Sequence, residues 1–401
     1  MLFAGDYAPN GRTVSLPNRM NGIALLANLE TPLIDDVPLP PVEFKSGPSL
    51  YSAGLGLQGI GNAPIVFSIA NNHSMDYGIA GLTSTMRQLD KLGVRYVGAG
   101  LSVSAARNPV IVDADGLRVG IIGCRESQFG SKNCADMGWW VFDAISDLKT
   151  KVDKIVVSAH AAAEDSPFPS PAICRLYRRF IDFGADVVHG HHSHVPQGWE
   201  SYHNGLIFYG LGNFVADPIV WPNFANRWSL VADVDFSYAK PKVSVFCCEC
   251  VPDGAKGVSV RKCEVRKGSK IDRYLEVCLR ALSDEKLTEG YWQDAACRLY
   301  ERTYGSPLCH PSFAASRLDR HGRIHFIAEG FRKITEGVLG RRLPSQRTIS
   351  AAANAYNCMQ CLSHSEMIKT AMGMALGNIY DLRNADITAD CDFIFSFMKE
   401  F

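Results

Sequence analysis

The sequence predicts an α/β protein that ends in a mainly helical region. Up to about residue 250, short β-rich apolar runs alternate with helical or glycine-rich stretches. Polar residues follow five of these runs directly, which is typical of strands that deliver side chains to one edge of an open sheet. After residue 268 the apolar residues recur at helical spacing instead. We therefore expect two domains, 1–268 and 269–401.

Composition narrows the class of protein. A chain of 401 residues can bury a large core. The 41 basic and 41 acidic residues balance, so the charge indicates no nucleic-acid partner. No apolar run reaches the length of about 18 residues that a membrane span needs. Met1 leads directly into the first β-rich run, without a signal peptide, and the 13 cysteines are scattered, so we expect reduced thiols and a cytoplasmic location.

Each of the five β-rich runs is followed by a carboxylate, an amide or an imidazole. The runs are 2–4, 23–27, 65–70, 155–159 and 187–188. The residues that follow them are, in order, Asp6, Glu30, Asn72 with His73, His160, and His192 with His194. Oxygen and nitrogen ligands without cysteine suit Mn²⁺, Zn²⁺ or Fe. Because seven such groups exceed what one ion needs, the set predicts two divalent ions that share a bridging carboxylate.

A histidine cluster is the strongest single signal. Four of the 11 histidines lie between residues 189 and 194. In an extended segment His192 and His194 point to the same side, so they are expected to meet one metal centre. Gly190 is expected to let the backbone approach a bound group closely. The alternative is a surface loop of solvated histidines.

The segments between these runs read as framework. Asp76 is interpreted as the N-cap of the helix that follows it, in preference to a ligand. A hairpin is expected around Asp115-Gly116. Helices are predicted over 78–92 and 172–183, and strands over 94–97, 206–209, 230–236 and 243–250.

Seven motifs, in order over about residues 1–217, resemble the CapA family of poly-γ-glutamate capsule-biosynthesis proteins, distant relatives of the calcineurin-like metallophosphoesterases. The motifs are Gly5-Asp6, Asn28-Leu29-Glu30, the segment 70–78, Gly98-Ala99-Gly100, Gly184-Ala185-Asp186, the segment 190–197, and Leu211-Gly212-Asn213-Phe214. The resemblance implies a four-layer metallophosphoesterase-like β-sandwich flanked by helices, with the metal centre at the edge that the two sheets share.

The resemblance also implies a role for each matching residue. Asp6, Asn72, His160, His192 and His194 correspond to metal ligands, and Glu30 to the bridging carboxylate. His73 corresponds to a catalytic histidine that protonates the leaving group or stabilises the transition state, and Glu164 is a second catalytic candidate. Lys45, His191 and Asn213 are candidates for substrate binding.

Two departures from the family pattern change these expectations. Ala8 stands where the phosphoesterases have a histidine, so one of the two metals is expected to be missing or weakly held. The segment from His160 to Asp165 keeps His160 and Glu164 but has lost the aromatic residues usual between and after them. We therefore expect different substrate contacts there.

The last third is expected to be helical. Ser269 is a candidate N-cap for a helix whose apolar residues run from Ile271 to Leu282, and similar spacing recurs over 331–339 and 368–380. The Cys358–Cys361 pair is interpreted as two small structural residues. This region is expected to be a lid over the metal edge, a surface for homo-oligomerisation, or a module that binds a partner.

Together these features predict a metal-dependent hydrolase. A metal-bound hydroxide would attack a phosphoester or an amide bond, γ-glutamyl amides included, and His73 would assist the leaving group. The substrate would be a small molecule or polymer that carries phosphate or carboxylate groups. Two alternatives are a non-catalytic assembly or binding component of capsule biosynthesis and a metal-dependent transferase or ligase-like enzyme.

Overall fold

The computed structural model describes residues 1–20, 22–34, 39–42, 48–57, 65–127, 132–217, 227–304 and 362–399. Three of the sequence-based predictions lie outside these residues. They concern Lys45, the helical spacing over 331–339, and the Cys358–Cys361 pair.

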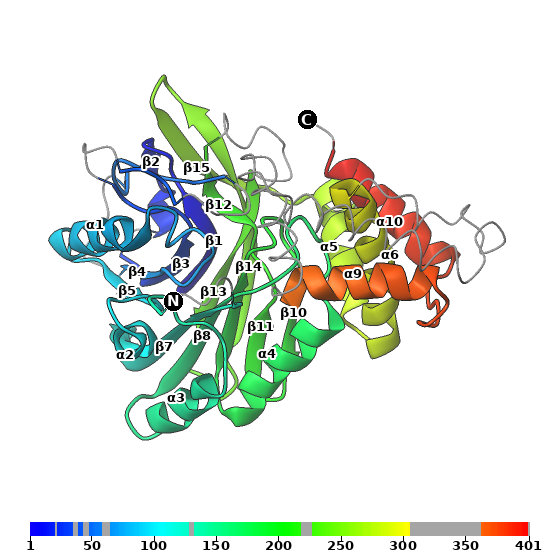
Figure 1. Cartoon of the computed structure of the whole chain (residues 1–401), viewed down its shortest axis with the longest axis horizontal. Helices are drawn as coiled ribbons and strands as arrows, with labels where there is room; N and C mark the ends of the chain where they lie inside the picture. Colours follow the sequence, from blue (N-terminus) through cyan, green and yellow to red (C-terminus); the bar gives the residue numbers. More distant parts are fainter. Residues whose placement is uncertain are drawn as a thin grey trace, which may run out of the picture.

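Two mixed sheets form the body of the described chain (Figure 1). One has nine strands: β1 (Leu2–Ala8), β2 (Thr13–Ser15), β3 (Leu25–Leu29), β4 (Ile65–Ser68), β5 (Arg95–Val97), β12 (Asn213–Ala216), β13 (Trp228–Asp235), β14 (Lys242–Asp253) and β15 (Gly257–Cys263). The other has six: β6 (Val110–Ala114), β7 (Leu117–Arg125), β8 (Lys154–His160), β9 (Val187–His191), β10 (Trp199–Tyr202) and β11 (Gly205–Phe208). Their orders are β2-β15-β14-β13-β1-β3-β4-β5, with β12 beside β1, and β10-β11-β9-β8-β7-β6.

Helices cover the outer faces of both sheets. Apolar residues of α1 (Gly78–Lys91) pack on the nine-stranded sheet. Those of α3 (Trp140–Leu148) and α4 (Pro171–Phe183) pack on the six-stranded sheet. The remaining elements of the described residues up to 268 are η1 (Asn18–Met20) and α2 (Val103–Arg107). The arrangement is thus helix, sheet, sheet, helix.

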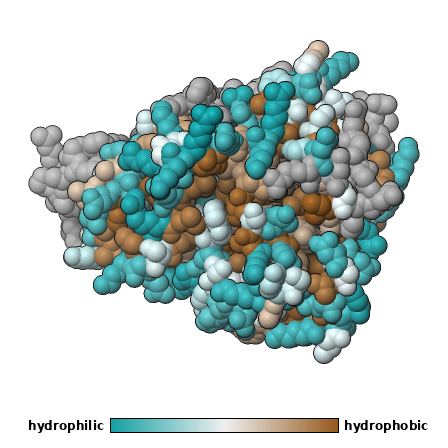
Figure 2. Space-filling view, turned by 180° about the vertical axis from the view of Figure 1, so that it is seen from behind, coloured by the Kyte–Doolittle hydropathy of each residue, from teal (hydrophilic) through white to brown (hydrophobic). Residues whose placement is uncertain are grey.

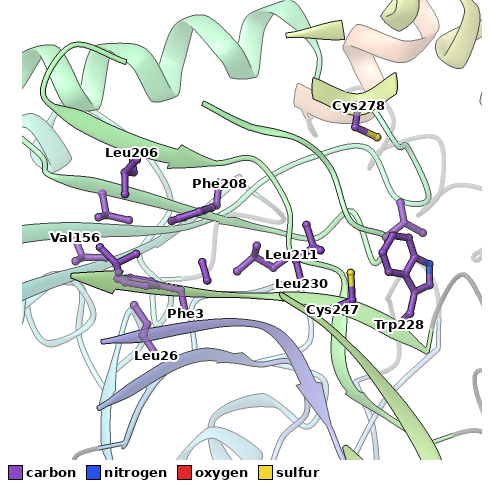
Figure 3. Close-up of a cluster of buried hydrophobic side chains, with 14 of the residues drawn as sticks. Phe3, Leu26, Val156, Leu206, Phe208, Leu211, Trp228, Leu230, Cys247 and Cys278 are labelled. Atoms are coloured by element: carbon purple, nitrogen blue, oxygen red, sulfur yellow. The ribbon is translucent and has the colours of Figure 1, made fainter. Parts of the chain in front are cut away.

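The main hydrophobic core lies between the two sheets (Figure 3). Phe3 and Leu26 enter it from the nine-stranded sheet, and Val156 and Phe208 enter it from the six-stranded sheet. All four side chains are fully or almost fully buried. This shared core holds the two sheets in one arrangement and so fixes the relative positions of their strand ends.

Four helices lie in the described residues after 268 and gather on one side of the molecule (Figure 1). They are α5 (Lys270–Ala281), α6 (Glu285–Tyr304), α9 (Leu362–Ala375) and α10 (Ala385–Phe397). Tyr274 of α5 joins the core between the sheets, and its hydroxyl donates to the Pro196 carbonyl at 2.6 Å. The helices thus pack directly on the sheets, and the division at residue 268 stays a prediction.

Most predicted elements agree with the structure. The five β-rich runs form β1, β3, β4, β8 and β9, and the hairpin around Asp115-Gly116 joins β6 to β7. The Ser269 side chain caps α5 by accepting from the Asp272 amide. The N-cap assigned to Asp76 is wrong, because α1 is preceded by Tyr77 and has no side-chain cap. The Asp76 carboxylate is instead committed to the functional site described below.

Hydrophobic residues also reach the surface of the described chain. Figure 2 shows them gathered around the middle of the reverse face, with hydrophilic residues along its lower rim. Among the described helices, none combines the length and the hydrophobicity that crossing a bilayer would require.

Gly5 lets two backbones meet beside the site, and this can be tested. A Cβ at residue 5 would lie 1.8 Å from the Gly212 carbonyl oxygen, so the backbone would have to move. We expect Gly5→Ala to lower the free energy of unfolding by about 1–3 kcal/mol, the usual cost of overpacking. Chemical denaturation measures this. Gly54→Ala is the control because a Cβ there meets nothing within 4 Å. Equal stability of the two variants would contradict the close approach.

Candidate metal centre

The polar residues predicted to meet do so at one edge of the two sheets. β1, β3 and β4 run parallel in the nine-stranded sheet, and β8 and β9 run parallel in the six-stranded sheet. Their carboxyl ends therefore point the same way within each sheet, and the shared core places the two sets together. Parallel sheets characteristically bind ligands at this edge.

One group of side chains surrounds His194. Its Nδ1 atom lies 3.5 Å from an Asp6 carboxylate oxygen and 3.6 Å from Glu30 Oε2. The Asn213 Oδ1 atom is 3.1 Å from the same nitrogen. Asp6 comes from β1, Asn213 begins the adjacent strand β12, and Glu30 follows β3. One imidazole nitrogen and three oxygens at these distances can bind a cation between them.

A second group surrounds His160 at the end of β8. Its Nε2 atom lies 3.0 Å from Asn72 Oδ1 and 3.5 Å from Glu30 Oε1. The rings of His160 and His192 have centroids 4.4 Å apart. Glu30 therefore faces His194 with one oxygen and His160 with the other. This is the position expected of a carboxylate that links two groups of ligands.

Buried polar atoms without hydrogen bonds show that these residues fit a metal ion. Among the described residues, Glu30 Oε1, His191 Nδ1 and both ring nitrogens of His192 are buried without a hydrogen-bond partner. Such atoms cost free energy unless something binds them. Within the described residues, Glu30, His192 and His194 each offer a ligand atom, and these atoms lie within 4.8 Å of one another. This buried group can hold a metal.

The two central carboxylates have opposite pKa shifts. Burial alone would raise the pKa of Asp6, but the imidazoles of His191 and His194 lower it well below its ordinary value. Burial, reinforced by the negative charge of Asp6, raises the pKa of Glu30 well above its ordinary value. Two carboxylates so close together and so buried need a positive charge between them to be ionised together.

Two local expectations about the histidine cluster are wrong, although the convergence itself is confirmed. Strand β9 ends at His191, and His192 and His194 adopt φ values of 87° and 57°, so they do not lie in an extended segment. Two left-handed residues turn both rings toward Glu30. Gly190 accommodates the protein backbone, because a Cβ there would lie 2.2 Å from the Tyr209 carbonyl oxygen.

His73 lies beside the two groups and is paired with Asp76. The His73 Nδ1 atom is 2.8 Å from Asp76 Oδ2, and both side chains are almost fully buried. The same carboxylate oxygen accepts a hydrogen bond from the Leu50 amide at 2.7 Å. A histidine held in this way by a carboxylate has a defined orientation. The three-residue spacing between His73 and Asp76 could have indicated this pair, but Asp76 was interpreted as a helix cap.

The remaining candidates occupy different positions. Glu164 Oε1 is 3.8 Å from His192 Nε2, and the Glu164 side chain is 48% exposed, so it stands at the rim of the site. The His191 side chain is 0% exposed and lies behind Asp6. Its role in substrate binding stays a prediction that this burial does not favour. Asn213 is buried against His194, and its predicted contact with substrate is also untested.

Sequence reasoning missed Asn28, which holds two of the candidate ligands in place. Its amide nitrogen lies 2.8 Å from Asp6 Oδ1 and 3.2 Å from His160 Nδ1. The Asn71 amide in turn donates to Asn28 Oδ1 at 3.1 Å. Asn28 stands two residues before Glu30, and this period of two along the strand could have identified it.

The C-terminal helices also reach the site, which the sequence could not show. Glu126 follows β7, its amide donates to the His160 carbonyl at 2.9 Å, and its carboxylate accepts from the Ser363 hydroxyl at 2.6 Å. Ser363 and His364 lie in the first turn of α9. The charge of Glu164 acts on His364, whose pKa is lowered chiefly by burial. The start of α9 thus adjoins the rim at Glu164.

Comparison with known proteins agrees with this site. Residues 21–218 match the family described as "Bacterial capsule synthesis protein PGA_cap". The capsule biosynthesis protein CapA of Bacillus anthracis is 35% identical over 164 residues, which are 38% of this chain and 40% of that protein. A "Probable polyglutamine synthesis accessory protein" of Mycobacterium tuberculosis is 32% identical over 224 residues, 50% of this chain and 57% of that protein.

The matches are partial, and solved structures are more distant. The chain spans about half the length of the curated relatives it matches, from 40% to 57% in the two just described. A phosphatase from Mycoplasma pneumoniae is 11% identical and covers 66% of this chain and 92% of its own, with a TM-score of 0.35. That score is too low to support an argument. On its sequence match, the part of the chain from residue 21 to residue 218 belongs to the PGA_cap/CapA family of bacterial capsule synthesis proteins.

Proposed function

We propose that the protein is a metal-dependent hydrolase that cleaves a phosphoester or an amide bond. The observation that carries the proposal is the buried group of Glu30, His192 and His194, in which Glu30 Oε1 and both nitrogens of His192 make no hydrogen bond in the described chain. A site that served only to stabilise the fold would not need the paired His73 and Asp76 beside it.

We further propose that the centre holds two divalent ions, Mn²⁺, Zn²⁺ or Fe, bridged by Glu30. Asp6 and His194 would hold one ion, and His160, Asn72 and His192 the other. The two oxygens of Glu30 support this division, since they lie 3.6 Å from His194 Nδ1 and 3.5 Å from His160 Nε2. Such ions polarise the bond to be cleaved and lower the pKa of water.

The protein's own side chains would then position the substrate and move protons. His73, oriented by Asp76, would donate a proton to the leaving group. Glu164 is half exposed beside His192, where it would accept a proton or contact the part of the substrate that leaves the site. The start of α9, held by Glu126, would form a wall next to Glu164.

The helix–sheet–sheet–helix order supports a metallophosphoesterase-like architecture for the first 268 residues, which is part of this proposal. Ligands at the carboxyl ends of strands from both sheets are consistent with phosphoester cleavage. The names of the relatives concern capsule and polyglutamine synthesis, and they support γ-glutamyl amides as a second substrate class. A role without catalysis in the assembly of such a polymer is the alternative that the experiments below would detect.

Metal binding is the first test of this proposal. We expect the full chain to bind Mn²⁺ or Zn²⁺ after chelation and dialysis, and Glu30→Gln to bind at least about 100-fold more weakly, because losing even an outer partner of a ligand costs 10–100-fold. Isothermal titration and elemental analysis measure this. Glu200→Gln is the control, because Glu200 is not one of the candidate ligands. Its Oε1 atom pairs with Arg178 Nε at 2.8 Å. Unchanged binding in Glu30→Gln would contradict the bridging role.

Catalysis is the second test. We expect the metal-loaded chain to hydrolyse an aryl phosphomonoester, an aryl phosphodiester or a γ-glutamyl anilide. His73→Gln should lower kcat by about 10²–10⁴-fold, the usual contribution of a general acid. It should leave metal affinity unchanged, because His73 lies outside both ligand groups. Failure to hydrolyse any of the three substrates with any of the three metals would favour the assembly role.

The His73–Asp76 pair makes a separate prediction. Asp76→Asn removes the charge that favours protonated His73, so the acidic form of His73 should be lost at a lower pH. We expect the alkaline limb of the kcat–pH profile to shift to lower pH, while His73→Gln abolishes that limb. Asp90→Asn, at an exposed position of α1, the helix that follows Asp76, is the control. An identical profile for Asp76→Asn and the wild type would show that the pair has no role in proton transfer.

A further inference from the structure

The position of His191 suggests a role that differs from substrate binding. Its ring is completely buried at the end of β9, with Nδ1 3.3 Å from Asp6 Oδ1. Its other nitrogen, Nε2, lies 3.2 Å from His189 Nδ1 and 3.2 Å from Ser158 Oγ. The ring is therefore held between the interior of the protein and the carboxylate of Asp6.

The hydrogen bonds behind His191 determine which of its nitrogens carries the proton. His189 Nε2 lies 2.9 Å from the Ala4 carbonyl oxygen, and a carbonyl can only accept, so His189 Nε2 must carry a hydrogen. His189 is buried against Phe3, with ring centroids 5.3 Å apart, and such a site favours a neutral ring. His189 Nδ1 is then an acceptor, and His191 Nε2 must be the donor to it.

When the His191 ring is neutral, this assignment leaves its Nδ1 atom with a lone pair. The atom makes no hydrogen bond in the described chain, although Asp6 Oδ1 is only 3.3 Å away. Two atoms that both carry lone pairs repel each other at this distance unless a cation lies near both. Ligand atoms bound to Zn²⁺ at 2.0–2.1 Å in a tetrahedral site lie about 3.3–3.4 Å apart. The observed separation matches that geometry.

We infer that His191 is a metal ligand through Nδ1, which together with Asp6 and His194 holds the ion on the Asp6 side of Glu30. The inference rests on the proposed two-ion centre and adds a residue to it. Ala8, two residues after Asp6 on β1, has no ligand atom in its side chain. The imidazole of His191 on β9 would supply a ligand in its place. The Asp6-side ion is then held by four side chains, Glu30 included, and is not weakly bound.

A pair of substitutions distinguishes a ligand from a residue that only orients Asp6. Gln at 191 can extend an amide as far as Nε2 but leaves the Nδ1 position empty, whereas the shorter Asn places an amide near Nδ1. The full chain, stripped of metal, is titrated with Zn²⁺, and bound zinc is counted by elemental analysis. Unfolding of the metal-free proteins is followed in parallel. His203→Gln is the control, because its side chain is 66% exposed.

We expect the wild type to bind two Zn²⁺ ions and His191→Gln to lose more than about 100-fold in affinity for one of them, beyond the 10–100-fold typical of an orienting residue. His191→Asn should lose less than His191→Gln. A loss within 10–100-fold, or equal affinity with reduced stability of the metal-free protein, would overturn the assignment and indicate an imidazolium that pairs with Asp6. A wild type that binds no zinc, manganese or iron would instead overturn the proposed function.

Discussion

The arrangement of the site depends on two carboxylates that are buried side by side. Asp6 and Glu30 leave adjacent parallel strands and are each only 2% exposed. Burying one charge without a partner is costly, and burying two like charges together is more so. Three imidazoles face these carboxylates, those of His160, His191 and His194. The two buried carboxylates at this edge of the sheets therefore need additional positive charge, which a divalent cation can supply.

The packing of the sheets makes this charge arrangement possible. The core between the sheets fixes where β1 and β3 end relative to β8 and β9. Close backbone approaches then bring the segments together: Gly5 against the Gly212 carbonyl, and Gly190 against that of Tyr209. Asn28 links the two sheets at the centre, since it contacts Asp6 from one sheet and His160 from the other. The candidate ligands are thus held by a rigid framework, which favours metal binding without rearrangement.

The C-terminal helices are part of the same structure. Ala163, next to Glu164, packs on the cluster that Trp292 of α6 and Met367 of α9 form. Arg302 pairs with Asp165 at 2.9 Å, and Ser363 holds Glu126. These contacts enclose the segment after His160, in which three alanines are followed by Glu164 and Asp165. Of the three roles expected for this region, the contacts favour a cover for the rim of the site, while oligomerisation and partner docking stay predictions.

The sequence by itself determined the α/β class, the strands that end in polar residues, and the set of residues that meet at one edge. It could do so because strand periodicity and the parallel order of β1, β3 and β4 are local or nearly local properties. It did not determine how individual side chains are used. The preference for Asp76 as a helix cap was wrong, because its partner His73 is reached only through the turn that precedes α1.

Only the tertiary structure decided the partners that come from distant segments. Asn28 contacts a residue 132 positions away, and Ser363 contacts one 237 positions away, so no spacing rule could relate them. The burial of His191 behind Asp6 likewise depends on how β1 of one sheet meets β9 of the other. The physical reason is the same in each case: periodicity determines which face a side chain takes, whereas packing between sheets and helices determines what that face meets.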